Sequence, residues 1–185
     1  MPTPARTSLE EIVKAGRSIV EATGLESLTM QRVAAAVGVK APSLYKRVQN
    51  RDTLVRLVVE GIAGEIADRL DAAASTGDAL EDLRSMAHAL RAYAHAHPTA
   101  YGLLFAQLPI GARPDLEHLA RTSAAIVRTT TSLAGPDVAL EAARTVVAWA
   151  HGFISMELGG AFRLGGDVDR AYAFGIERLG AALAR

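Results

Sequence analysis

Cysteine is absent from this 185-residue chain, and aromatic residues make up only 5% of it. Without cysteine there is no disulfide framework, thiolate zinc site or cysteine nucleophile, which suits a reducing compartment. No apolar run reaches the roughly 20 residues of a membrane span, and the short, Pro- and Thr-containing start Met1–Ser8 does not resemble a signal peptide. We therefore expect a soluble, cytoplasmic protein with an aliphatic, alanine-rich core and no membrane partner.

Acidic residues are missing between Thr29 and Arg51, a stretch that holds five basic residues. The formal net charge is zero, but residues 1–56 carry nine Lys and Arg against five Asp and Glu, a net +4, which leaves −4 for the remainder. Such an asymmetry indicates that one end of the chain faces a polyanion. Charges that only solvate a surface are the alternative.

Sustained period-two alternation is also absent, and apolar residues recur at helical spacing throughout. Ser8 and Glu11 form a capping box, and Thr29, Asn50 and Asp167 are expected N-caps. The sequence thus predicts an all-α protein of about nine helices. They are expected near residues 8–23, 30–37, 41–47, 51–70, 79–97, 99–108, 114–133, 137–158 and 168–183.

Two short helices joined through Gly38, after a longer first helix, are typical of a helix-turn-helix. The first of the two must pack over the second, and small apolar residues are available for that crossing: Ala34, Ala35, Val37 and Val39. The second must keep its outward face free of acid, because it enters a groove flanked by phosphates. Residues that meet this demand are Lys40, Ser43, Tyr45, Lys46 and Arg47. A core position is the alternative for Tyr45, and simple solvation is the alternative for Lys46 and Arg47.

The segments Leu28–Val39, Ala41–Val48 and Asn50–Leu54 resemble the DNA-binding head of the TetR (tetracycline repressor) family over about a quarter of the chain. The resemblance implies a transcriptional regulator, by family default a repressor, that binds palindromic operator DNA as a homodimer. It places Thr29 and Arg51 at phosphate-contacting positions, and Ser43, Tyr45 and Lys46 on the recognition helix. The predicted DNA-binding residues are Thr29, Gln31, Arg32, Lys40, Pro42, Ser43, Tyr45, Lys46, Arg47 and Arg51. Two departures are Val48, where an aromatic residue is usual, and Lys40, where a small hydroxyl residue is common.

By the same resemblance, residues 1–53 form a three-helix DNA-binding domain, and a long fourth helix joins it to an effector-binding and dimerisation domain over residues 54–185. The helix at 137–158 is apolar on nearly every side, so both its flanks must be covered. We expect the last two helices to form a four-helix interface with a second copy; complete burial within one monomer is the alternative. The run Trp149-Ala150-His151-Gly152, with His97-Pro98 and Tyr101, resembles a subgroup marked by a W-x-H-G element.

We expect the helices between Leu54 and Phe162 to enclose a largely apolar cavity for a small effector. Candidate lining residues are Met86, Tyr93, Tyr101, Phe105, Trp149, Phe153 and Met156, each of which could equally be plain core. Binding of the effector would shift the two heads from the roughly 34 Å separation that successive major grooves require.

The five histidines do not suggest a metal site, because His88, His95 and His118 lie on polar helix faces and only His151 lies in an apolar helix. An interior or interface position suits His151 better than a ligand contact. No nucleophile–base arrangement, phosphate-binding glycine loop or paired-carboxylate motif supports an enzyme, and no cofactor is expected. A structural DNA-coating protein would be basic along its whole length. A DNA-binding regulator without a small-molecule ligand remains the alternative function.

Overall fold

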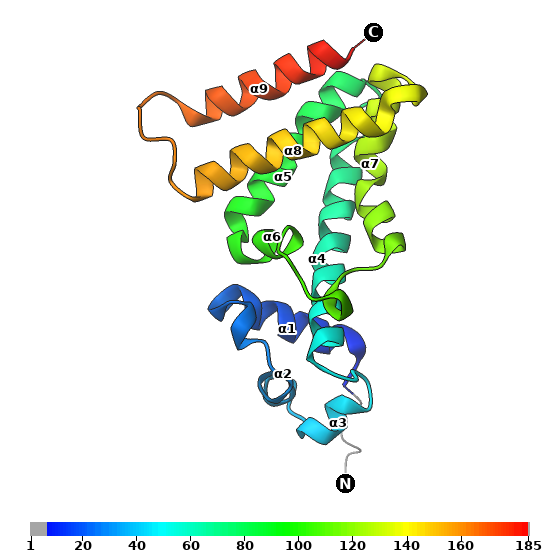
Figure 1. The fold of residues 1–185 in the computed structure, drawn as a ribbon, viewed down its shortest axis with the longest axis vertical. Helices are drawn as coiled ribbons and strands as arrows, with labels where there is room; N and C mark the ends of the chain where they lie inside the picture. Colours follow the sequence, from blue (N-terminus) through cyan, green and yellow to red (C-terminus); the bar gives the residue numbers. More distant parts are fainter. Residues whose placement is uncertain (1–6, 185) are drawn as a thin grey trace. The chain divides into compact units, whose positions relative to one another are not determined.

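The fold is entirely helical over residues 7–184, which are the residues that the computed structural model describes. Along this range run nine α-helices and three short 3-10 helices, with no strand, which confirms the all-α prediction. In chain order they are α1 (Leu9–Thr23), η1 (Leu25–Ser27), α2 (Met30–Ala36), α3 (Ala41–Tyr45), α4 (Arg51–Ala73), α5 (Ala79–Ala96), α6 (Pro98–Leu104), η2 (Ile110–Ala112), α7 (Leu116–Ala134), η3 (Pro136–Val138), α8 (Ala139–Leu158) and α9 (Val168–Leu183) (Figure 1). None of the described helices combines the length and apolarity required to cross a bilayer. Most of the opening stretch Met1–Ser8 lies outside the described residues.

The predicted capping residues begin their helices. The Ser8 hydroxyl accepts a hydrogen bond from the Glu11 amide at 3.0 Å, and the Glu11 carboxylate accepts one from the Ser8 amide at 2.7 Å. At the other end of the chain, the Asp167 carboxylate accepts a bond from the Arg170 amide at 3.0 Å. Each cap satisfies an amide that has no partner within the helix itself. Local sequence therefore sets these helix boundaries.

The predicted extent of the sixth helix, 99–108, is wrong. The helix α6 begins at Pro98, since proline is well accommodated in a first turn, and it ends at Leu104. The Phe105 amide bonds to the Gly102 carbonyl at 3.3 Å, a tighter i to i−3 bond that closes the helix four residues early. The eighth helix also differs slightly, because the 3-10 turn η3 precedes α8.

The described residues form two compact units. The first unit contains the described residues up to Gly64 together with His97–Leu119, and the second contains Glu65–Ala96 and the described residues from Ala120 onward. The helices α4 and α7 therefore each supply residues to both units. The predicted division after residue 53 is a different one and stays a prediction.

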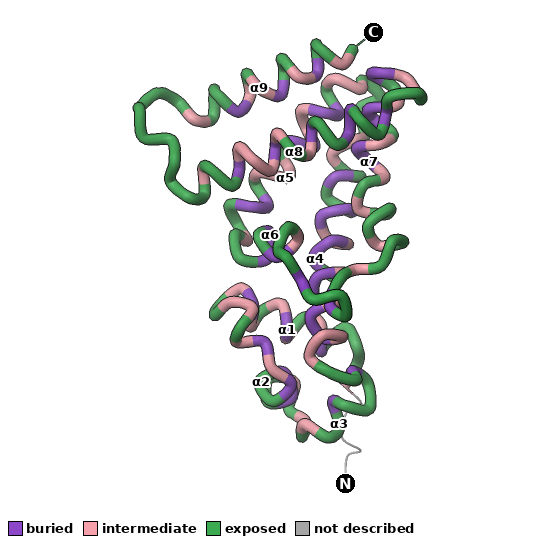
Figure 2. Tube along the Cα trace, viewed as in Figure 1, coloured by how far each residue is buried: buried purple, intermediate pink, exposed green. Residues whose placement is uncertain are grey.

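In the first unit, α1 and α4 approach each other through glycine. A Cβ atom at Gly16 would lie 2.7 Å from Cγ2 of Val58, and one at Gly61 would lie 2.9 Å from Cγ1 of Val13. Neither position has room for a methyl group without movement of its neighbour. Buried positions are purple in Figure 2, and those of the first unit include the aliphatic residues Ile12, Val20, Leu28, Leu44, Val48 and Leu54. The helix α2 packs on α1, and α3 packs on α2.

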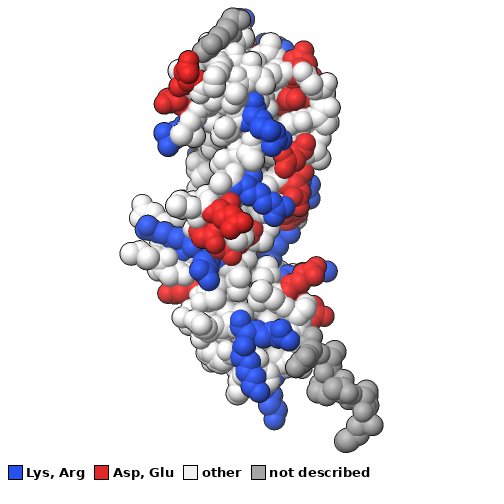
Figure 3. All heavy atoms as spheres, turned by 90° about the vertical axis from the view of Figure 1, so that its right-hand side faces the viewer, with Lys and Arg blue, Asp and Glu red and all other residues white. Residues whose placement is uncertain are grey.

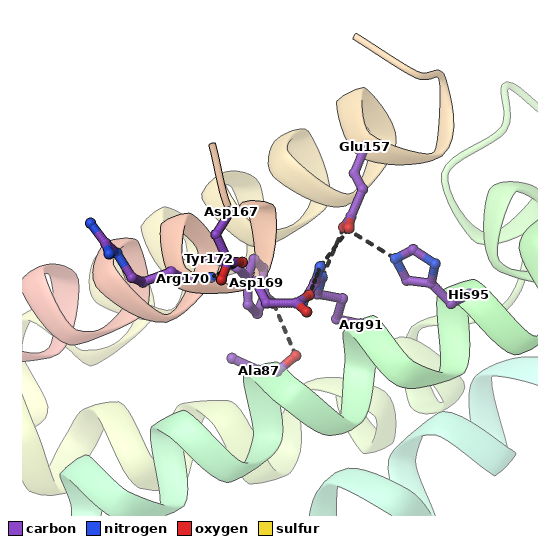
Figure 4. A network of polar contacts seen from close by, with 8 residues as sticks. All are labelled: Ala87, Arg91, His95, Glu157, Asp167, Asp169, Arg170 and Tyr172. Carbon is purple, nitrogen blue, oxygen red and sulfur yellow. Dashed lines mark hydrogen bonds and ion pairs between the residues drawn. The ribbon is translucent and has the colours of Figure 1, made fainter. Parts of the chain in front are cut away.

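In the second unit, α5, α8 and α9 are joined by a network of polar contacts (Figure 4). The Arg91 guanidinium pairs with Glu157 at 2.8 Å and with Asp169 at 2.6 Å. The Tyr172 hydroxyl donates to the Ala87 carbonyl at 2.9 Å, and burial is the largest cause that raises the pKa of this phenol, to above its usual range. A Cβ at Gly175 would lie within 2.1 Å of the Trp149 ring, so α8 and α9 also meet through a glycine.

The helix α8 is not completely buried within the chain. Ala139, Ala142, Ala143, Val146, Ala150 and Ile154 are buried, as expected for an inward flank. Leu140 and Met156, however, are 48% and 51% exposed, and Leu158 is exposed as well. The alternative of complete coverage within one monomer is therefore wrong for the described residues, because apolar side chains of α8 remain exposed.

Candidate nucleic-acid interface

The helices α2 and α3 are joined by a tight turn at Gly38. This residue has a φ of +73°, a conformation that costs a glycine little, and the following Val39 amide bonds back to the Ala34 carbonyl at 2.9 Å. Ala34 is 2% exposed, and α2 and α3 pack against each other. The prediction that Ala35 shares this contact is wrong, since it is exposed. One residue further along a helix turns the side chain by about 100°.

The helix α3 separates an anchored face from an exposed one. Leu44 is 1% exposed and Val48 is fully buried, so the smaller valine fills the core at that position. Tyr45, beside Leu44, is 48% exposed, which places its ring on the surface. The remaining predicted residues on and beside α3 are also exposed: Lys40, Pro42, Ser43, Lys46 and Arg47. Because the sequence has no acid in this stretch, the exposed face carries positive charge without an opposing carboxylate of its own.

The two helices that flank this face have capped N-termini. The Thr29 hydroxyl accepts a bond from the Arg32 amide at 3.2 Å, and the Asn50 side chain accepts one from the Thr53 amide at 2.8 Å. Gln31 and Arg32 are exposed on α2. In the space-filling view, Lys and Arg side chains form a group near the lower end of the picture, on the first unit (Figure 3). Most of the predicted residues are thus exposed on one basic helix-turn-helix.

Arg51 differs from the rest of the predicted set. Its Nε donates to the Leu28 carbonyl at 2.9 Å, and its Nη2 donates to the Leu25 carbonyl at 3.0 Å. The side chain is half-buried. The resemblance implied a phosphate contact here, but two of the five guanidinium N–H groups are directed at the protein's own backbone.

The predicted effector-lining residues are divided between the two units. Tyr101 and Phe105 belong to the first unit, with ring centroids 5.3 Å apart; Tyr101 is buried and Phe105 is 43% exposed. In the second unit, Met86 and Tyr93 are buried, Trp149 and Phe153 are half-buried, and Met156 is on the surface. An open depression near the start of α9 involves none of these residues; it is lined by Gly166, Asp167, Arg170, Ala171, Ala173, Phe174 and Glu177.

Two of the partly exposed histidines lie within hydrogen-bonding distance of carboxylates. The His95 Nε2 lies 3.1 Å from a Glu157 oxygen. The His118 Nδ1 lies 2.8 Å from the Asp115 carboxylate, and this hydrogen bond raises the pKa of His118 above its ordinary value. His151 is half-buried, and its desolvation lowers the pKa of its ring. Solvation alone, as predicted for His95 and His118, is therefore an incomplete account.

Glu60, Asp115 and His118 form a cluster that the sequence analysis missed. Each offers one ligand atom, and these atoms lie within 4.8 Å of one another, as a divalent cation would need. Asp115, however, also caps α7 by accepting the His118 amide at 3.0 Å, and Glu60 lies 3.9 Å from Arg56. Capping and ion pairing account for this geometry. The Asp-x-x-His spacing was the available signal.

Family models match both parts of the chain. Residues 12–58 match the model for bacterial regulatory proteins of the tetR family, and residues 83–179 match the tetracyclin repressor-like C-terminal domain. The HTH-type transcriptional regulator Rv0681 of Mycobacterium tuberculosis is 33% identical over 98% of this chain and 84% of its own length. The class E tetracycline repressor protein of Escherichia coli is 33% identical over 31% of this chain and 28% of its own.

Solved structures share the fold. A protein of unknown function from Rhodococcus sp. RHA1 superposes with a TM-score of 0.80 at 20% identity, covering 100% of both chains. A TetR variant from Acinetobacter baumannii AYE, in complex with minocycline, superposes with a TM-score of 0.67 at 20% identity, covering 95% of this chain and 96% of that one. With its exposed basic helix-turn-helix and matches in both halves, the chain belongs to the TetR family of DNA-binding bacterial transcriptional regulators.

Proposed function

We propose that this protein is a ligand-responsive repressor that binds palindromic operator DNA as a homodimer and is released by a small, largely apolar effector. The observation that carries the proposal is α3, a helix anchored by Leu44 whose outward side chains are exposed and free of acid. A protein that binds operator DNA acts where the chromosome is, so the cytoplasmic location is part of this proposal.

In this proposal the exposed residues have two kinds of task. Ser43, Lys46 and Arg47 face the base edges or the neighbouring phosphates, since hydroxyl and basic side chains supply the donors that both require. Tyr45, with its ring on the surface, contacts the sugar-phosphate backbone. The remaining proposed backbone contacts come from Thr29, Gln31, Arg32, Lys40 and Pro42. Phosphate contacts orient the head, and base contacts select the sequence.

Exposed apolar side chains on and after α8 and on α9 support the proposed dimer. Leu140, Met156 and Leu158 are exposed on α8, Phe162 and Leu164 follow it, and Phe174 on α9 is 59% exposed. Exposed apolar residues gathered on two neighbouring elements are typical of an interaction surface. A second copy that uses the same two helices would cover them symmetrically.

The proposed effector site rests on the aromatic content of the second unit. The ring of Trp149 stacks on Tyr172 with centroids 5.2 Å apart, and Phe153 meets Tyr172 edge-on at 5.1 Å. We assign the Trp149–Gly152 run to the subgroup with a W-x-H-G element. A protein of the same fold has been crystallised with minocycline, which supports a small-molecule effector for this chain.

DNA selection tests the proposal directly. The purified protein is mixed with a library of random duplexes, the enriched sequence is identified, and its affinity is measured for wild type and for the variants Tyr45→Ala, Lys46→Gln and Lys14→Gln. Lys14 is an exposed α1 residue outside the predicted set, so Lys14→Gln removes the same charge as a matched control. We expect a palindrome, with affinity reduced at least tenfold by the α3 variants and little changed by the control.

Three results would count against the proposal. If no duplex is enriched, the DNA-binding role of α3 is wrong. If Lys14→Gln weakens binding as much as Lys46→Gln, binding is non-specific attraction to the basic unit. If a panel of small apolar molecules never releases the enriched duplex, the regulator without a ligand is the better description.

A further inference from the structure

The segment that reads DNA in the proposed function is enclosed by a side-chain contact between its two ends. Leu28 immediately precedes the cap of α2, and Arg51 is the first residue of α4. Both carbonyls that Arg51 reaches, those of Leu25 and Leu28, lie in the η1 turn or directly after it. The contact therefore joins the chain before α2 to the chain after α3, and it encloses all the other predicted DNA-binding residues.

The geometry of this contact requires a guanidinium group. The Nε and Nη2 atoms donate along two directions to two different carbonyls, at 2.9 and 3.0 Å. The planar fork of arginine holds such donors at fixed angles, whereas the ammonium group of lysine is a point charge on a flexible stem. Leu28 is fully buried, so its carbonyl belongs to a rigid part of the core. Arg51 is thereby tied to a fixed point.

We propose that Arg51 is a positioning residue that holds the two ends of the helix-turn-helix together through its bonds to the Leu25 and Leu28 carbonyls, a contact that we call the clasp. Its contribution to sequence-specific binding then comes from the clasp and not from a phosphate contact. The inference rests on the proposed function for its effect on DNA, but the clasp itself is a property of the free protein. Closing the 23-residue separation between Leu28 and Arg51 limits how far α3 can rotate on α4. Base contacts depend on that orientation, while general attraction to phosphates does not.

The variants Arg51→Lys and Arg51→Gln separate a clasp from a phosphate contact. Affinity is measured for the duplex enriched by the wild-type protein and for a random duplex of equal length, at several salt concentrations. If Arg51 is a clasp, both variants lose at least tenfold in affinity for the enriched duplex and little for the random one. A general loss of folded protein would reduce both affinities by the same factor.

A phosphate contact gives a different pattern. Arg51→Lys would then bind the enriched duplex nearly as well as wild type, and Arg51→Gln would lower the slope of log affinity against log salt by about 0.9. Lys46→Gln serves as the reference for the loss of a charge at the DNA surface. That pattern, or an equal loss of specific and random binding, overturns the proposal.

Hydrogen exchange of the free wild-type and Arg51→Lys proteins tests the clasp without DNA. We expect faster exchange of amides in residues 29–50 of the variant and unchanged protection in α5, α8 and α9. Equal protection of residues 29–50 in the two proteins would overturn the proposal even if the variant bound DNA poorly. If the wild-type protein enriched no duplex, the proposed function would fail while this measurement still decided the clasp.

Discussion

The helix-turn-helix and the α5–α8–α9 bundle are stabilised over very different distances along the chain. In the helix-turn-helix, the capping bonds join residues that are three positions apart, as between Thr29 and Arg32. The contacts of Arg51 span 23 and 26 residues. In the bundle, Arg91 reaches Glu157 across 66 residues and Tyr172 reaches Ala87 across 85. The head is mainly a product of local sequence, and the bundle a product of long-range contacts.

This difference has a functional meaning within the proposed mechanism. A DNA-reading element must present the same side chains in the same orientation each time, and caps with a fixed turn achieve that locally. A unit that responds to an effector must be able to change how its helices pack against one another. Contacts between helices far apart in sequence can rearrange while each helix stays intact.

The largest effect is expected from Arg91→Met. Arg91 and Glu157 have side chains only 12% and 13% exposed, so the variant leaves a largely buried carboxylate with His95 as its remaining neighbour and without the guanidinium. We expect the free energy of unfolding to fall by about 3 kcal/mol, measured by urea unfolding followed by circular dichroism. Glu157→Gln in the Arg91→Met background should recover part of the loss. A loss below about 1 kcal/mol would mean that the bundle does not depend on this pair.

Gly16→Ala should have the next largest effect. The added methyl group would lie 2.7 Å from Val58 in a packed core, and such overpacking costs about 2 kcal/mol. Gly102→Ala is the matched control, because a Cβ on this helical glycine meets nothing within 4 Å, and it should be neutral or slightly stabilising. Thermal unfolding of both variants checks this. If the two shift the melting temperature equally, the close α1–α4 crossing is not real.

Thr29→Ala should cost about 1 kcal/mol, the usual value of an N-cap. The variant removes the oxygen that accepts the Arg32 amide, whereas Thr29→Ser keeps it and should behave like wild type. Urea unfolding gives the free energies, and hydrogen exchange of α2 locates the change. Loss of the same free energy in both variants would assign the effect to the threonine methyl group instead.

The smallest effect should be a pH dependence carried by His118. Its pKa is raised in the folded protein, chiefly by the hydrogen bond to Asp115, so its contribution to stability is fully present below about pH 6.5. That contribution is lost as the pH rises through the folded pKa. The fall in melting temperature between pH 5.5 and 8.5 should therefore be smaller in His118→Asn than in wild type. An identical fall in both proteins would contradict this assignment.

Local patterns determined much of the head in advance. Capping chemistry placed the starts of α1, α2 and α4, and Gly38 placed the turn. The exposure of Tyr45 was also expected, from the need of a DNA-facing helix for an acid-free outer face. These features depend on residues within one or two turns of each other, which a sequence displays directly.

Only the tertiary structure determined where some helices end and which partners several side chains have. The end of α6 at Leu104, the exposure of Ala35 and the contact of His95 with Glu157 were each mispredicted or missed. The arginine at position 51 could be assigned to DNA from its motif, but only its bonds to the Leu25 and Leu28 carbonyls reveal a clasp. A side chain's partner depends on which helices are brought together by packing, and the energies of many distant contacts jointly determine that arrangement.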